Sequence, residues 1–177
     1  MTVASDGVVN LRPMTADDLP TMRLWDAQAS VDQPFNFFDD SPVQERAVPI
    51  AGTGFGAEDI NRLVVTLLEG ALIGDVSWHR VGYGPNERSA AYNIGIGLQP
   101  KYRGQGHGTR VQRLLADYLF ERTDVFRVEA STDVDNVAEQ RALEKAGFTR
   151  EGVVRGAQFR AGAYRDIVLF GRLRTDR

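Results

Sequence analysis

The sequence predicts a single-domain α/β protein with a mixed, mostly antiparallel central sheet of about six to seven strands and helices on both faces. Segments with alternating apolar residues occur in both halves of the chain, and stretches of helical period lie between them. A glycine-rich break separates the strand predicted at 90–98 from the amphipathic run 109–120. The 177 residues suffice for one core, so we expect a single domain over 1–177 with its core within about 8–173.

The first predicted elements are a short strand at 8–12 and a helix. Thr15 has the position of the helix N-cap, and Asp18, three residues later, makes an imperfect capping box with it. The apolar side of this helix consists of Leu19, Met22 and Trp25.

Periodicity is lost between about 30 and 60, where phenylalanines are mixed with prolines, glycines and aspartates. One interpretation is a surface connection whose phenylalanines complete the core. The other is a wall of a binding site, because long loops over a rigid scaffold often carry specificity. The residues leave both interpretations open.

The second half of the chain is predicted to contain most of the sheet. Strands at 62–69, 71–80 and 90–98 form an antiparallel set, with turns at Gly70 and at 83–87. After the helix at 109–120 come a strand at 125–130, a helix from Asn136 to the C-cap Gly147, and strands at 149–159 and 163–173.

The glycine-rich break carries the main functional signal. Gly104, Gly106 and Gly108 stand where a strand passes into a helix, so the backbone can approach a ligand and the first helical amides are available to a phosphate. A P-loop is excluded because no Gly-Lys-Ser/Thr sequence follows. A dinucleotide fingerprint is disfavoured by the even spacing of the glycines and by their position in the second half of the chain.

Composition excludes several classes of function. The chain has no cysteine, which removes disulfides, cysteine-based metal sites and a thiol nucleophile, and we expect no metal. A net charge of −3 argues against general nucleic-acid binding. The N-terminus lacks the features of a signal peptide and no apolar stretch is long enough to span a membrane, so we expect a cytoplasmic protein.

The glycine break also resembles the Gln/Arg-x-x-Gly-x-Gly/Ala signature of the GCN5-related N-acetyltransferases (GNAT), filled here by Arg103, Gly106 and Gly108. The helix exit at 144–148, the Arg-Glu-Gly at 150–152 and the Tyr-Arg-Asp at 164–166 resemble the RimJ/RimL-like branch of that family. The resemblance extends from about Leu11 to Leu173 and implies the GNAT fold.

The resemblance also implies a site for acetyl-CoA. The backbone of Ile96 and Leu98, with Gly97 between them, would bind the pantetheine arm. Asn136 would contact that arm or line its channel, although it is equally a good N-cap for the helix that starts there. The pyrophosphate would be held by Arg103, Gly104, Gln105, Gly106, His107, Gly108 and Thr109.

The resemblance is incomplete at the reacting groups. Many family members have a glutamate on the strand before the loop, where this chain has Asn93, and a serine or tyrosine on the following helix, where it has Glu139 and Leu143. We therefore take Glu139 and Tyr92 as the candidate catalytic residues. Further candidates near strand ends are His79, Glu129 and Asp133.

In the family, the segment corresponding to 30–60 shapes the acceptor side, so we expect the amine acceptor to contact Phe35, Phe38, Asp39 and Trp78. The implied reaction is acetyl transfer to a primary amine by direct attack, with a protein N-terminus or a small amine as acceptor. The alternatives are an acyl-CoA-binding protein without turnover, and an acyltransferase that uses an acylated carrier or an aminoacyl-tRNA. A homodimer is possible.

Overall fold

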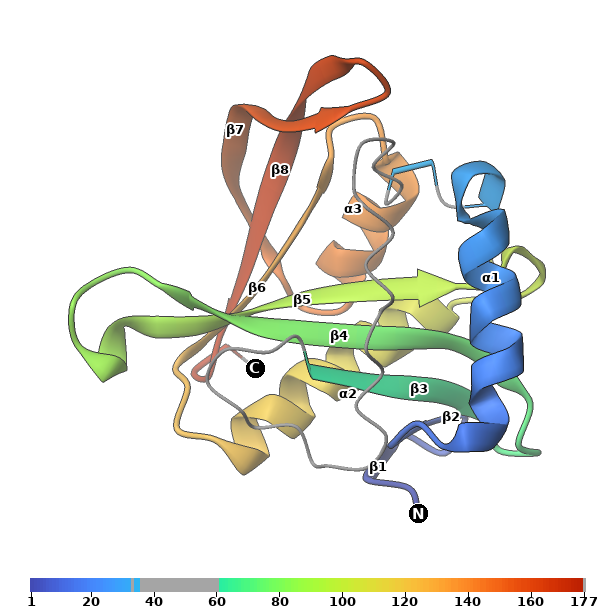
Figure 1. The fold of residues 1–177 in the computed structure, drawn as a ribbon. Coiled ribbons are helices and arrows are strands. Elements are labelled where there is room, and N and C mark those ends of the chain that lie inside the picture. The colour runs from blue at the N-terminus through green and yellow to red at the C-terminus, as the bar shows by residue number, and fades with distance from the viewer. Residues whose placement is uncertain (33, 36–60, 177) are drawn as a thin grey trace.

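The computed structural model describes residues 1–32, 34–35 and 61–176, and within them it shows one sheet of eight strands (Figure 1). The strand order is β1-β2-β3-β4-β5-β6-β8-β7, and all neighbours are antiparallel except the parallel pair β5 and β6. The strands are β1 (Ala4–Ser5), β2 (Val9–Arg12), β3 (Asn61–Leu67), β4 (Leu72–Gly82), β5 (Ala90–Leu98), β6 (Arg127–Asp133), β7 (Thr149–Arg160) and β8 (Ala163–Leu173). The mixed, mostly antiparallel sheet is confirmed. It has one strand more than the upper expectation, because the two-residue β1 extends the edge beside β2.

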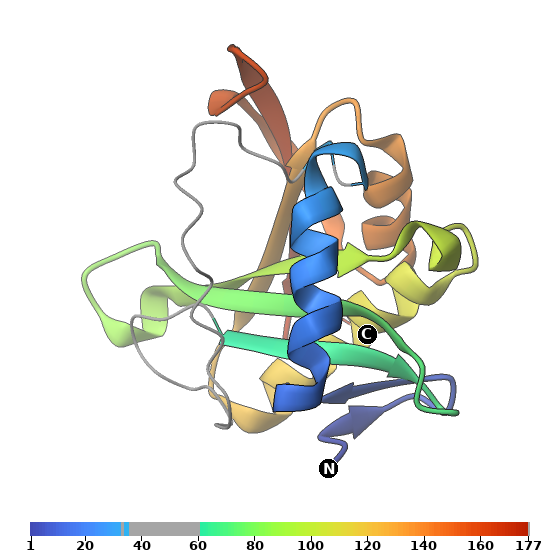
Figure 2. The same ribbon diagram turned by 45° about the vertical axis from the view of Figure 1, so that its right-hand side comes forward.

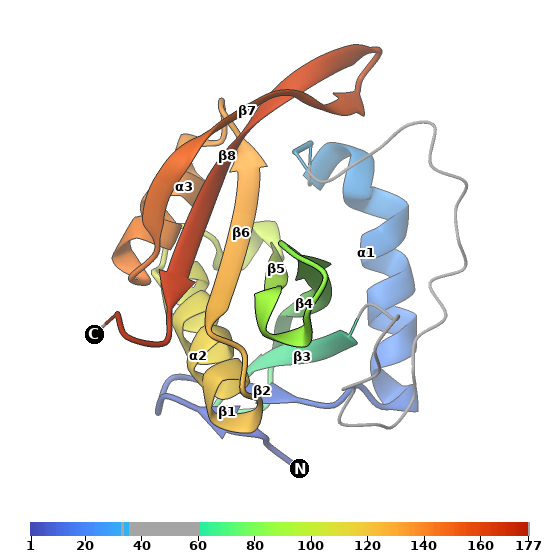
Figure 3. The same cartoon turned by 90° about the vertical axis from the view of Figure 1, so that its left-hand side faces the viewer.

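Helices cover both faces of the sheet, as expected. Helix α1 (Leu19–Asp32) lies on one side, and α2 (His107–Arg122) and α3 (Val137–Lys145) lie on the other (Figure 3). Figure 2 shows α1 passing across β3, β4 and β5. Within the described ranges, no helix is long and apolar enough to cross a membrane.

The entry into α1 is fixed by the predicted capping box. A short 3-10 turn, η1 (Ala16–Asp18), precedes the helix, and the reciprocal bonds of Thr15 and Asp18 are both present. Asp18 accepts hydrogen bonds from the Thr15 amide at 2.8 Å and from the Arg12 guanidinium at 2.7 Å. Hydrogen bonds from Arg12 and then from Thr15 outweigh burial and lower the pKa of Asp18 to about 2.

Each face of the sheet has its own apolar core. On the face toward α2, Trp78 of β4 is 1% exposed and meets the ring of Tyr118 edge-on, with centroids 6.3 Å apart. On the face toward α1, Val64 of β3 packs with Met14 and Met22. Because successive residues of a strand point to opposite faces, the contacts of Trp78 and Val64 show which residues of β3 and β4 face α2 and which face α1.

Candidate functional site

The sheet opens between its two parallel strands. Pairing of β5 with β6 covers Ala91–Ile94 and Arg127–Ala130, whereas β5 continues to Leu98 and β6 to Asp133. The strands therefore diverge after Ile94 and Ala130, as seen in Figure 1. The end of β5 leads into the glycine loop and the end of β6 leads into α3, so both following helices begin beside the opening.

The register with β4 shows which backbone groups of β5 face this opening. The Gln99 amide bonds to the Ile73 carbonyl at 2.9 Å, and in an antiparallel pair such bonds recur at every second residue. Gly97 and Gly95 thus direct their backbone toward β4, while Ile96 and Leu98 direct theirs toward β6. This is the side on which the family resemblance implies a pantetheine arm. The Leu98 carbonyl accepts a hydrogen bond of 2.8 Å from Arg103 Nε, so an arm bound at that oxygen would replace the exposed Arg103 side chain.

The loop after β5 has the backbone that its glycines permit. Gly104 and Gly106 have φ values of +71° and +82°, in the left-handed region that favours glycine. A Cβ at either position would meet no atom within 4 Å, so both glycines border open space. The tight turn and the space for a close ligand are thus both present.

The N-terminus of α2 presents amides that the helix does not use. Gly106 is the N-cap, and the first backbone bond into the helix runs from the Arg110 amide to the Gly106 carbonyl at 3.3 Å. No side chain in the described part of the chain caps the preceding amides of His107, Gly108 and Thr109. Uncapped amides with the positive end of the helix dipole form an anion site. The helix starts two residues before the predicted position 109 because the left-handed Gly106 turns the chain directly into it.

Buried polar atoms accumulate at the same end of α2. His107 Nδ1 has no hydrogen-bond partner among the described residues, and neither amide atom of Gln112 has one, although Gln112 is 1% exposed. Gln112 lies beneath the loop, since its Nε2 would be 3.9 Å from a Cβ built on Gly108. The sequence analysis missed Gln112, whose only signal was a polar residue within the apolar stripe of the helix.

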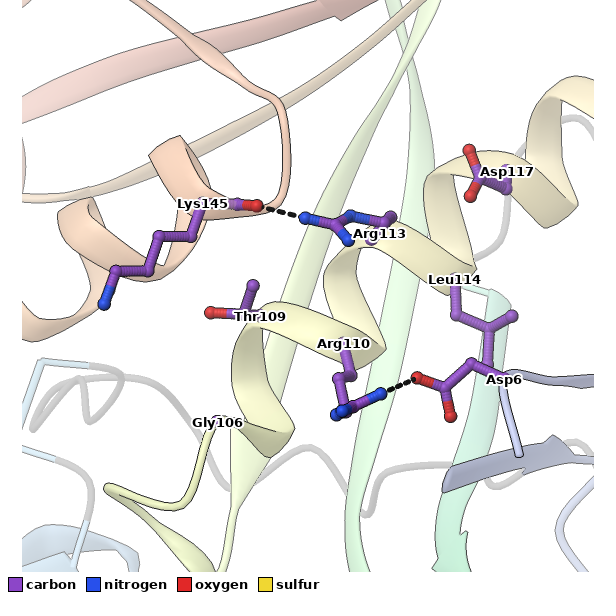
Figure 4. A pocket seen from close by; sticks show the side chains of 8 residues that line it. All are labelled: Asp6, Gly106, Thr109, Arg110, Arg113, Leu114, Asp117 and Lys145. Atoms are coloured by element: carbon purple, nitrogen blue, oxygen red, sulfur yellow. Dashed lines mark hydrogen bonds and ion pairs between the residues drawn. The ribbon is translucent and has the colours of Figure 1, made fainter. Parts of the chain in front are cut away.

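A basic cavity adjoins the loop along α2 (Figure 4). Its volume is about 490 Å³, and it begins at Gly106 and Thr109. Its basic lining residues, none of which the sequence analysis selected, are Arg110 and Arg113 of α2 and Lys145 of α3.

The first turn of α3 holds the candidate proton donor. The Asn136 side chain caps α3 by accepting from the Glu139 amide at 3.4 Å, and its Nδ2 donates to Thr132 Oγ1 of β6 at 3.0 Å. The N-cap interpretation of Asn136 is thereby confirmed. Glu139 is half-buried on the same helix stripe as the fully buried Leu143, and burial raises the pKa of Glu139 to about 7.

On the face of the sheet toward α1, a carboxylate lies beside Asn93, the position at which the resemblance implies a glutamate in many family members. Asn93 Nδ2 donates to Glu129 Oε1 at 3.2 Å across the parallel strands. Glu129 is 4% exposed and also accepts from the Tyr83 hydroxyl at 2.5 Å and from Arg127 Nε at 2.9 Å. Burial, and then the bond to Glu129, raise the pKa of Tyr83. Glu129 is thus a buried, fully engaged carboxylate of the α1 face.

Three predicted site residues lie away from the opening between β5 and β6. Trp78 is buried in the core against α2, because alternation along β4 turns its side chain toward that helix, and we do not retain it as a contact of the acceptor. Tyr92 is paired with Val128 before the strands diverge and packs against the same core. His79, paired with Asn93, is an exposed residue of the α1 face.

The start of the proposed acceptor segment is held by a buried ion pair. Arg160 of β7 pairs with Asp133 at the end of β6, and both residues are buried. Arg160 also donates to the Pro34 carbonyl at 2.7 Å, and its guanidinium lies 5.6 Å from the Phe35 ring centroid. Phe35 is thus half-buried near the open end of β6. Phe38 and Asp39 lie outside the described residues.

Comparison with known proteins places the chain among acetyltransferases. A family model described as an acetyltransferase (GNAT) domain matches residues 9–149. "Probable N-acetyltransferase YjcK" of Bacillus subtilis (strain 168) is 35% identical over 92 residues, covering 52% of this chain and 49% of the relative. The spermidine N(1)-acetyltransferase of Escherichia coli (strain K12) is 26% identical over 166 residues, covering 90% and 83%. The chain therefore matches about half the length of the first relative and most of the second.

The fold comparison agrees. The solved structure of Mycobacterium smegmatis RimJ in complex with CoA-disulfide has a TM-score of 0.75 to this chain at 23% sequence identity. The similarity covers 97% of this chain and 84% of that one. It shows that the two chains share a fold.

Proposed function

Because the chain belongs to the GNAT acetyltransferase family, we propose that it transfers the acetyl group of acetyl-CoA to a primary amine by direct attack in a ternary complex. The observation that carries this proposal is the divergence of β5 from β6 directly beside the uncapped N-terminus of α2. An extended strand edge next to an anion site suits a ligand that joins an amide-bearing arm to a diphosphate.

The residues present fit this cofactor. Gly104 and Gly106 border open space, the amides of residues 107–109 precede the first helical bond, and basic side chains line the adjoining cavity. Acetyl-CoA supplies the activated acetyl group, and its CoA portion leaves as the thiolate. The backbone of Ile96 and Leu98 would orient its arm along the opening between the strands.

Glu139 is the residue we assign to the departing thiolate. With a pKa of about 7, roughly half of its carboxyl groups carry a proton at neutral pH, so they can donate it. Its place in the first turn of α3, which follows the open end of β6, supports this assignment. Tyr92 is not retained for this role.

The carboxylates of the α1 face bear on the choice of acceptor. Each of the following belongs to an arginine ion pair: Arg62–Asp75, Arg127–Glu129 and Arg160–Asp133. Carboxylates engaged in this way are poor partners for a polycation, because an arginine already occupies them. An α-amine, with a pKa near 8, loses its proton to water far more readily than an alkylamine with a pKa above 10. This favours a peptide or protein N-terminus as acceptor over spermidine.

The test is CoA release from acetyl-CoA in the presence of Ala- or Ser-terminated peptides, spermidine and aminoglycosides. We expect turnover with the peptides and a kcat/KM at least tenfold lower with spermidine. A higher kcat/KM with spermidine would reverse the acceptor assignment and leave the acetyltransferase proposal standing. Tight CoA binding without release under any amine would instead indicate a binding protein. Failure to bind CoA would point to a carrier-linked or tRNA-linked donor.

A matched pair of glycine variants tests the loop. Gly106→Tyr projects a side chain into the space proposed for the diphosphate, whereas Gly70→Tyr imposes a similar left-handed strain at φ +93°, with equally open surroundings, in the β3–β4 turn. We expect Gly106→Tyr to lower CoA affinity at least a hundredfold, and Gly70→Tyr to leave it unchanged. Equal affinities would remove the loop from the site.

A further inference from the structure

The two helices that flank the opening between β5 and β6, α2 and α3, lie on the same face of the sheet (Figure 3). The proposed diphosphate site belongs to α2, so the cofactor would enter the opening from that face. Its arm would run past Leu98 and Ile96 toward Ile94, where the strands come together. The thioester would then lie at the closed end of the opening, and an amine would approach it from the opposite face, toward α1.

Alternation along the strands identifies the side chains on the α1 face at this closed end. Trp78 faces α2 and is paired with Ile94, so Asn93, one residue earlier on β5, faces α1. Glu129 is paired with Asn93, and Ser131, two residues further along β6, faces the same side. Asn93 thus precedes the point of divergence directly, and Ser131 follows it directly.

The side-chain amide of Asn93 has a fixed orientation. Its Nδ2 donates to Oε1 of Glu129 at 3.2 Å, and Glu129 is 4% exposed. Turning the amide over would bring Oδ1 against the carboxylate, so Oδ1 is directed away from Glu129. Gly95, the next residue of β5 on this face, is exposed and has no side chain. The half-buried Asn93 therefore offers a hydrogen-bond acceptor beside an open stretch of the strand.

The hydroxyl of Ser131 supplies a second acceptor. Ser131 is half-buried, and a hydroxyl oxygen has two lone pairs. Residues placed diagonally on neighbouring strands, as Asn93 and Ser131 are, have Cα atoms about 7–8 Å apart. One nitrogen atom between the two side chains can donate a hydrogen bond to each. A neutral primary amine has two N–H groups and one lone pair, so two such bonds would also fix the direction of the lone pair.

We propose that Asn93 Oδ1 and Ser131 Oγ accept the two N–H groups of the neutral acceptor amine and so direct its lone pair toward the thioester. The inference rests on the proposed function for its reaction. An amide oxygen orients an amine without removing a proton from the ammonium form, in agreement with an acceptor whose pKa is near 8. The arrangement favours primary amines over secondary amines, because a neutral secondary amine has a single N–H group.

Steady-state kinetics test the inference with the best primary amine of the acceptor panel and with the same amine carrying an N-methyl group. Asn93→Ala and Ser131→Ala should each lower kcat/KM for the primary amine about tenfold, the usual effect of one lost hydrogen bond. Calorimetric titration should show unchanged affinity for CoA in both variants. The N-methylated amine can use only one of the two acceptors, so one of the two variants should leave its kcat/KM unchanged.

Asn10→Ala is the control, because it changes a half-buried asparagine of β2, away from the opening. Ser131→Ala keeps the test decisive if Asn93→Ala, which also loses the bond to Glu129, does not fold. An unchanged kcat/KM for the primary amine in Ser131→Ala would overturn the inference and leave the proposed function intact. Tenfold losses with both amines in both variants, or a parallel loss of CoA affinity, would do the same. Absence of CoA release by the unmodified protein with every amine would overturn both.

Discussion

Asn93 on β5 donates a hydrogen bond to Glu129 on β6, 3.2 Å away, where the parallel strands are still paired. At the position where the resemblance implies a glutamate in many family members, this chain has an amide, and the neighbouring strand supplies a carboxylate beside it. Glu129 is held by Tyr83 and by Arg127, whose pKa is raised by hydrogen bonds, first to Glu151 and also to Glu129. We therefore infer that the hydrogen bond between Asn93 and Glu129 stabilises the register of β5 and β6 just before the two strands diverge.

Glu129→Gln should lower the free energy of unfolding by about 2–3 kcal/mol, because an amide cannot accept from Arg127, Tyr83 and Asn93 without turning its own N–H groups toward a donor. The comparison is Glu151→Gln, whose side chain is 36% exposed and whose loss should cost less than about 1 kcal/mol. Urea denaturation of both variants measures the difference. Similar losses in the two variants would contradict the assignment of Glu129 as the centre of the network.

Gly74→Ala should be strongly destabilising because β4 and β5 leave no room for a methyl group there. A Cβ at Gly74 would lie 2.1 Å from the Gly97 carbonyl oxygen and 2.7 Å from Leu98 Cδ2. The expected loss is at least about 2 kcal/mol, with weaker CoA binding, since the displaced residues form the proposed strand edge. Gly82→Ala, at the other end of β4, meets nothing within 4 Å and should be neutral. Thermal unfolding and CoA titration of both variants test this, and a neutral Gly74→Ala would show that the strands can separate there without cost.

The local features of the fold were predictable from the sequence because each depends on neighbouring residues. The capping box of Thr15 and Asp18, the Asn136 N-cap and the left-handed Gly147, at φ +93°, all follow from residue type and spacing. The backbone of the glycine loop was predictable for the same reason, since its positive φ values occur at Gly104 and Gly106.

Features that depend on which face a strand residue takes were not predictable. Alternation along β4 and β5 shows that successive residues face opposite sides of the sheet, but it does not reveal which set meets α2, so the burial of Trp78 against Tyr118 could not be foreseen. The basic cavity was missed for a related reason. It combines Asp6, Arg113 and Lys145 from distant parts of the chain, and no local spacing connects them.

Glu139→Gln should lower kcat about tenfold to a hundredfold and leave the affinity for CoA unchanged, because the change removes only the proposed proton donor. The protonated form of Glu139 is the active one in this role, and deprotonation of the α-amine acceptor raises the rates of both enzymes alike. The ratio of kcat/KM between the unmodified enzyme and Glu139→Gln should therefore fall as pH rises through about 7. Glu144→Gln, an exposed change on the same helix, serves as the control. Steady-state kinetics of the unmodified enzyme and both variants from pH 5.5 to about 9 test this prediction. An unchanged rate in Glu139→Gln would exclude Glu139 from the mechanism.

The same carboxyl should make stability depend on pH. Its pKa is raised from 4.5 to about 7 in the folded protein, so between these values the unfolded chain has lost a proton that the folded chain keeps. The free energy of unfolding should therefore fall by up to about 3 kcal/mol as pH rises across this window. Glu139→Gln has no such proton, so its midpoint of thermal unfolding should exceed that of the unmodified protein by several degrees at pH 8 and differ little at pH 4. A constant difference at both pH values would show that Glu139 ionises normally.

Asp18 should have the opposite dependence at acid pH. Its pKa is lowered from 3.8 to about 2 by the Arg12 and Thr15 hydrogen bonds, so its contribution is complete above pH 3.8 and is lost as pH falls through about 2. Asp18→Asn should therefore reduce the free energy of unfolding by about 2 kcal/mol at pH 7, and the difference should vanish near pH 2. Asp17→Asn removes a neighbouring exposed carboxylate from the same turn and should change stability little at either pH. Urea denaturation at a series of pH values compares the two variants. If the loss in Asp18→Asn persisted undiminished at pH 2, the stabilisation would come from side-chain packing at the start of α1 and not from the charge that Arg12 holds.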